Sequence, residues 1–161
     1  MLTPLLALVA WGAVVLGPFA TERPSYATNV RVIEARLVPG TFKGVLLRLP
    51  QLRVYDREGR LVKDERGYRP ELKAALAEVL AGQATPDVTQ RLSKDLDLLL
   101  QGSKPLDRVP PGADFTLVEY WSTWCKPCQA LSRDLAEVLG GHPKLRFNLI
   151  HVDTGATGRG P

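Results

Sequence analysis

The sequence lacks any run of basic residues and has only two cysteines and two histidines. Its 21 basic and 17 acidic residues are interspersed, and no basic stretch alternates with aromatic residues. This distribution argues against a nucleic-acid-binding surface. Internal repeats and long low-complexity segments are also missing, and only the tail from Gly155 to Pro161 is rich in glycine. With 161 residues and 45% hydrophobic content, the chain can bury one core.

Charge is absent from the beginning of the chain. Residues 2–20 hold no charged side chain, and Leu5 to Phe19 has the composition of a signal-peptide hydrophobic region. Small residues at Ser25 and Ala27 predict cleavage after Ala27. No Lys or Arg precedes the hydrophobic run, which departs from the usual pattern, and an uncleaved membrane anchor is the alternative. We therefore expect residues 1–27 to be a signal peptide or anchor, and the protein to be exported to a periplasmic or other extracytoplasmic, oxidising compartment.

The two cysteines are two residues apart in Trp124-Cys125-Lys126-Pro127-Cys128. The preceding residues 115–121 predict a buried strand, and the apolar spacing that follows predicts a helix ending at Gly140-Gly141. Cys125 then lies at the helix N-terminus, where unpaired N–H groups and the helix dipole favour a thiolate. Lys126 adds positive charge, and Pro127 suits a first turn. Cys125 is thus the predicted nucleophile and Cys128, facing the core, the resolving thiol of thiol-disulfide exchange.

A cysteine pair at this spacing has three other interpretations. A zinc site would combine the cysteines with His142 and His151, but eight residues separate the histidines where three to five are expected. Covalent haem attachment would need histidine after Cys128, and Gln129 is there. A purely structural disulfide would close a very small loop and constrain the unfolded chain little. Redox chemistry is the favoured interpretation.

The segment from Glu119 to Cys128, EYWSTWCKPC, resembles the active site of the thioredoxin superfamily, and the resemblance covers about residues 104–153. In that family a carboxylate six residues before the first cysteine often accepts the proton of the second, and Glu119 is at that position. The resemblance implies this role for Glu119, whose burial would raise its pKa. It also implies that Trp124 presents an apolar surface to substrates. The family's lysine on the next strand has no counterpart, since Leu149 is at the matching place, and His151 is assigned no role.

Strands and helices are also predicted before the cysteines. Residues 29–37 and 43–49 predict two strands around the Pro39-Gly40 turn, and a hairpin pairs residues 52–55 with 60–63. Two helices are predicted next, at 70–81 and from Thr85 to Leu99. A proline-rich connector at 102–112 leads to the active-site strand, and a last strand is predicted at 145–153.

Thioredoxin-like chains normally continue past this last strand to a cis-proline loop, a hairpin and a final helix, which are not found after residue 153. Pro50, the hairpin and the helix from Pro70 resemble that missing half but precede the active site. The predicted fold is therefore α/β, a thioredoxin-like sheet flanked by helices with an additional or rearranged N-terminal β-rich segment. Residues 28–103 form that segment and 104–161 the active-site half. In the rearranged form, Pro50 follows a cis bond and the hairpin completes the sheet beside Cys125; a truncated thioredoxin unit is the alternative.

The sequence predicts an exported thiol-disulfide oxidoreductase that acts on protein disulfides and needs no dissociable cofactor. Expected partners are disulfide-containing clients, including apocytochromes, and a redox donor or acceptor protein; membrane contact is expected only through an uncleaved N-terminal segment. Net oxidation or isomerisation, instead of reduction, is a second possibility for the same site. A non-catalytic interaction domain is the alternative from another class. The enzymatic hypothesis requires the two sulfur atoms to lie within bonding distance and Cys125 to be less buried than Cys128.

Overall fold

The structure, a computed structural model, describes residues 23–41 and 48–155 and has an α/β fold. Eight strands form one mixed sheet in the order β4-β3-β2-β7-β8-β1-β5-β6, with three helices. The strands are β1 (Val30–Leu37), β2 (Gln51–Asp56), β3 (Arg60–Arg66), β4 (Asp87–Arg91), β5 (Leu99–Gln101), β6 (Lys104–Pro105), β7 (Phe115–Trp121) and β8 (Phe147–Asp153). The helices are α1 (Leu72–Leu80), α2 (Leu92–Leu96) and α3 (Lys126–Gly140).

The centre of the sheet joins segments that are far apart in the sequence. Strands β7, β8 and β1 are parallel neighbours, while β2 pairs antiparallel with β7, and β3 with β2. The predicted hairpin is therefore confirmed and lies in the same sheet as residues 115–121. The Leu49-Pro50 peptide bond that leads into it is cis. The predicted strands at 29–37 and 145–153 are also confirmed, with β8 beginning two residues later than expected.

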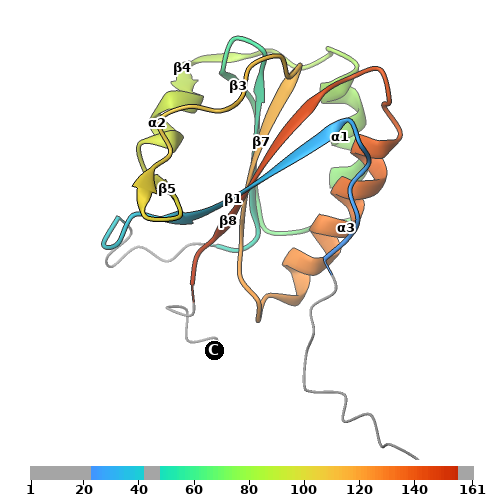
Figure 1. Cartoon of the computed structure of the whole chain (residues 1–161). Coiled ribbons are helices and arrows are strands. Elements are labelled where there is room, and N and C mark those ends of the chain that lie inside the picture. The colour runs from blue at the N-terminus through green and yellow to red at the C-terminus, as the bar shows by residue number, and fades with distance from the viewer. Residues whose placement is uncertain (1–22, 42–47, 156–161) are drawn as a thin grey trace, which may run out of the picture.

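Helices α1 and α3 lie on one side of the sheet and α2 on the other (Figure 1). Helices α1 and α3 pack on one face, where Leu76 and Leu135 contact the cluster around Leu117. On the other face, Leu96 and Leu99 belong to the cluster around Ile150. Each fully buried leucine contributes about 2 kcal/mol of transfer free energy. The central strands are buried on both faces, as their continuous apolar sequences predict.

The predicted helix from Thr85 to Leu99 is wrong for most of its length. Residues 87–91 form β4, which pairs antiparallel with β3, and only Leu92–Leu96 is helical before β5 begins. Val88, which would lie on the apolar face of such a helix with Leu92 and Leu96, is exposed on β4. Pairing with the open edge of β3 satisfies backbone groups that a helix would satisfy internally, and this tertiary contact overrides the apolar spacing. Similarly, the predicted connector at 102–112 contains the short strand β6.

The segment before β1 is attached to α3. The Asn29 amide donates to three carbonyls near the end of that helix, those of Leu139, His142 and Leu145, at 3.2, 3.1 and 3.0 Å. The Tyr26 hydroxyl donates to the Ser132 carbonyl at 3.4 Å, and its ring packs against the core. These contacts hold the start of β1 next to the C-terminal end of α3.

Two predictions fall wholly or mainly on residues that are not described. The predicted strand at 43–49 lies outside the described residues except for Arg48 and Leu49, which are not in a strand. The predicted hydrophobic region from Leu5 to Phe19 lies entirely outside them. Among residues 23–41 and 48–155, no helix is long and apolar enough to cross a membrane.

Candidate active site: a disulfide beside a buried carboxylate

Cys125 and Cys128 form a disulfide at the beginning of α3. The S–S distance is 1.96 Å, and the Cα atoms are 5.2 Å apart. Cys125 is the N-cap residue of the helix, and its sulfur accepts a hydrogen bond from the Cys128 N–H at 3.2 Å. Pro127 occupies the first turn, where its missing N–H costs no helical hydrogen bond. The local arrangement agrees with the predicted strand, cysteine pair and helix.

The burial of Cys125 differs from the prediction. Cys125 is 3% exposed and Cys128 1%, so in the disulfide form the first cysteine is nearly as buried as the second. The cause is packing, because both sulfurs lie against Trp121 and the partly buried Leu49. The prediction of an exposed Cys125 is therefore wrong for the oxidised protein, while the predicted approach of the two sulfurs is correct.

Glu119 is buried beneath α3. Its side chain has no exposed surface, and its Oε1 accepts a hydrogen bond from the Ser132 hydroxyl at 2.7 Å. Ser132 is four residues after Cys128 and therefore on the same side of the helix. The carboxylate thus lies within about one helical turn of Cys128. Burial raises the pKa of Glu119 to about 7, against smaller opposite effects of Ser132 and Arg23. The carboxylate is thus poised to exchange a proton near neutral pH.

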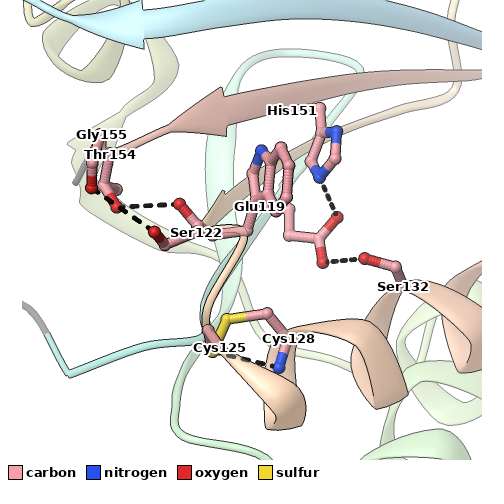
Figure 2. Close-up of a disulfide and its surroundings, with 9 residues drawn as sticks. Glu119, Ser122, Cys125, Cys128, Ser132, His151, Thr154 and Gly155 are labelled. Atoms are coloured by element: carbon pink, nitrogen blue, oxygen red, sulfur yellow. Dashed lines mark hydrogen bonds and ion pairs between the residues drawn. A yellow bond between two sulfur atoms is a disulfide. The ribbon is translucent and has the colours of Figure 1, made fainter. Parts of the chain in front are cut away.

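His151, which sequence reasoning left without a role, is the neighbour of Glu119. In the parallel pairing of β7 and β8, Glu119 is opposite His151 and Leu117 is opposite Leu149. Leu149 therefore lies beside Leu117 and not beside the carboxylate. His151 Nε2 is 3.5 Å from Glu119 Oε2, and neither atom has a hydrogen-bond partner among the described residues. Figure 2 shows the carboxylate between the Ser132 hydroxyl and the His151 ring.

The row of polar side chains continues onto β1. Glu34 is opposite His151 in the next parallel pair, and its Oε2 is 3.7 Å from His151 Nδ1. The imidazole also stacks on Trp121, with the ring centres 4.4 Å apart and the planes 15° apart. Burial lowers the pKa of His151 to about 4, and the charge of Arg23 acts in the same direction. The ring is therefore neutral near pH 7 and has one nitrogen able to donate and one able to accept.

A pocket opens beside this row. Its volume is about 310 Å³, and Arg23, Tyr26, Glu34 and His151 line it together with apolar residues. Arg23 forms an ion pair with Glu34, and its guanidinium lies 4.8 Å from the centre of the Trp121 ring. The pocket thus connects the buried histidine to the surface near Glu34, whose side chain is 54% exposed.

The remaining predicted site residues surround the disulfide. Trp124, Lys126 and Pro127 are exposed, and Trp124 is 46% exposed, unusual for a large apolar side chain. Pro50 is buried immediately before β2, next to Leu49, which packs on the cysteines. The sequence carries no local signal that His151 is the neighbour of Glu119. Only the pairing of β7 with β8 shows it.

In the described residues, no group of three or more His, Cys, Asp or Glu side chains is arranged to hold a metal ion. Comparisons with known proteins found no matching family, no matching curated protein and no matching solved structure. The site must therefore be interpreted from its own geometry.

Proposed function

We propose that this protein is a thiol-disulfide oxidoreductase that acts on protein disulfides. The observation that carries the proposal is the Cys125–Cys128 disulfide at the N-terminus of α3, beside the buried carboxylate of Glu119. A helix N-terminus lowers the pKa of a thiol there and favours its thiolate. The exposed Trp124 supplies an apolar surface next to the pair for an incoming protein.

We further propose that the fold is a rearranged thioredoxin-like fold. Within the sheet, the order β3-β2-β7-β8 places a hairpin antiparallel to the active-site strand β7 and a parallel strand, β8, on the other side. The thioredoxin fold has these neighbours too, but its hairpin follows the active site in sequence. Here the hairpin, preceded by Pro50 and followed by α1, comes first. This order supports a permutation over a truncated unit, because the sheet neighbours of β7 are complete.

The proposed reaction transfers two electrons from the reduced pair to a client disulfide. The Cys125 thiolate attacks one client sulfur, a mixed disulfide forms, and the other client sulfur leaves as a thiolate that takes a proton from water. Glu119 then removes the proton of Cys128, whose thiolate attacks the Cys125 sulfur. The second client thiolate leaves and the Cys125–Cys128 disulfide forms. A dithiol donor protein must reduce that disulfide for another cycle, and an oxidising partner would drive the reverse direction.

The burial of Cys125 favours a second candidate function, a non-catalytic interaction domain. A cysteine that is only 3% exposed is poorly placed to react with a partner thiolate. In that case Trp124 would serve binding alone.

Reduction of insulin by dithiothreitol separates the two candidates. We expect the wild-type protein to accelerate the appearance of turbidity and Cys125→Ser to lose the acceleration. Equal rates for the two proteins would contradict the enzymatic proposal and leave the interaction domain. Cys128→Ala should then trap client proteins as mixed disulfides, because the thiol that resolves them is missing, whereas Cys125→Ser should trap none.

We propose export as well, on the composition of residues 2–20. Cleavage after Ala27 would remove Arg23 and Tyr26 from their contacts with Trp121, Glu34 and α3. Glu34, His151 and the cysteine pair would remain in the mature chain. N-terminal sequencing of the exported protein tests this site of cleavage.

A further inference from the structure

The row Glu119, His151, Glu34 extends from the neighbourhood of Cys128 to the surface and is not explained by packing. Three titratable side chains occupy the same register position on three adjacent parallel strands, β7, β8 and β1. The inner pair is buried, and within residues 23–41 and 48–155 neither Glu119 Oε2 nor His151 Nε2 has a hydrogen-bond partner. Buried polar atoms without partners are costly, so their retention side by side points to a function.

We propose that His151 passes protons between Glu119 and Glu34, so that the resolving cysteine exchanges its proton with water at the half-exposed side chain of Glu34. The inference rests on the proposed oxidoreductase function and names a proton route for it. The oxidised cysteine pair is buried, whereas Glu34 is half exposed, so this row leads from the buried site to water. His151 is a positioning and proton-transfer residue that acts through Glu119.

Each proton transfer is balanced. When Cys128 gives its proton to Glu119, the protonated carboxyl donates to His151 Nε2, and the Nδ1 proton moves to Glu34, which releases it to water. When a dithiol donor reduces the disulfide, the steps reverse: Glu34 takes up a proton, Nδ1 receives it, and the Nε2 proton returns to Glu119 and then to the departing Cys128 thiolate. One half-reaction therefore moves the imidazole proton from Nδ1 to Nε2, and the other half-reaction moves it back. The distances of 3.5 and 3.7 Å require each carboxylate to move about 0.5 Å toward the ring.

Among the described residues, charged and polar groups approach this row from the N-terminal segment and from α3. On the N-terminal segment, the charge of Arg23 favours ionised Glu119 and neutral His151, and Tyr26 lies in the same pocket. From α3, Ser132 donates to Glu119, and the cysteines are the proton source. On the other side of β7, the residue paired with Glu119 is the apolar Leu52, and the next residue in that row is Glu65 of β3, which forms ion pairs with Lys63 and Arg69.

The test measures the rate at which dithiothreitol reduces the disulfide of the purified full chain, followed by tryptophan fluorescence and corrected for ionisation of the reductant. For the wild type we expect the corrected rate to fall as the pH rises through about 7, where Glu119 loses its proton. His151→Phe keeps a ring on Trp121 but has no nitrogen. Its rate below pH 7 should fall about tenfold or more, to the rate of Glu119→Gln, and lose the dependence on pH.

The double variant with both substitutions should be no slower than Glu119→Gln alone, since the two residues act in one route. Glu34→Gln should give a smaller loss, because water also reaches the pocket. His142→Phe is the matched control, as this other histidine has no side-chain partner assigned in the described structure, and it should match the wild type. A wild-type pH profile for His151→Phe would overturn the relay. That result would leave the oxidoreductase proposal intact, because the loss in Cys125→Ser tests that proposal separately.

Chemical rescue guards against a folding defect. In His151→Ala, the pocket of about 310 Å³ is enlarged by the missing ring. Imidazole added to this variant should restore the rate below pH 7, whereas pyrrole, which has the same size but no basic nitrogen, should not. Equal effects of the two compounds would show that the ring only fills space, and would refute the relay.

Discussion

Glu119→Gln should make the protein more stable at alkaline pH while impairing its chemistry. Burial raises the pKa of Glu119 to about 7, whereas an unfolded glutamate titrates near 4.5. The folded state therefore holds the proton more tightly, so the contribution of Glu119 to stability is complete below about pH 4.5 and is lost as the pH rises toward 7. A difference of about 2.5 pKa units corresponds to about 3 kcal/mol.

Glutamine cannot ionise, so the variant does not lose this stability as the pH rises toward 7. The free energy of unfolding of Glu119→Gln minus that of the wild type should therefore rise by about 3 kcal/mol between pH 4 and pH 8. His151 has the opposite effect, because its lowered pKa adds stability as the pH rises from about 4 to 6.5. Comparing the variant with the wild type at each pH removes that contribution.

The assay is guanidinium denaturation without reductant, so that the disulfide stays closed. Glu78→Gln, an exposed change on α1, is the control and should show no such trend. A difference between Glu119→Gln and the wild type that is the same at pH 4 and pH 8 would refute the reasoning, since it would mean that the buried carboxylate does not titrate in this range.

Three further predictions concern packing and access. Asn29→Ala removes the donor to three carbonyls at the end of α3, and denaturation should show a loss of about 1 to 3 kcal/mol. Asp95→Ala removes the acceptor, at 2.7 Å each, of the buried Tyr55 hydroxyl and of the partly buried Arg53 guanidinium, which keeps only Asp64 at 3.6 Å, and it should cost about 3 kcal/mol in the same assay. In the reduced protein, Cys125 should react with iodoacetamide faster than Cys128 in mass-spectrometric mapping; equal or reversed rates would favour the interaction domain.

The sequence by itself determined the elements that depend only on residues close together in the chain. The apolar run of β7, the apolar spacing of α3 and the two-residue gap between the cysteines placed the strand, the helix and the disulfide correctly. These features depend on residues a few positions apart, so periodicity and helix-end chemistry decide them. The hairpin of β2 and β3 was predictable for the same reason.

Contacts between distant segments decided the rest. The segment from Thr85 to Leu99 has helical apolar spacing, yet its residues 87–91 form a strand because they pair with the edge of β3. Cys125 is buried because Leu49 and Trp121 pack on it, which its position at a helix N-terminus does not reveal. His151 meets Glu119 only through the register of β7 and β8. Burial, strand register and the pKa values that depend on them are properties of neighbours brought together by folding. For this reason the close approach of the two cysteines could be predicted from the sequence, but the row of Glu119, His151 and Glu34 could not.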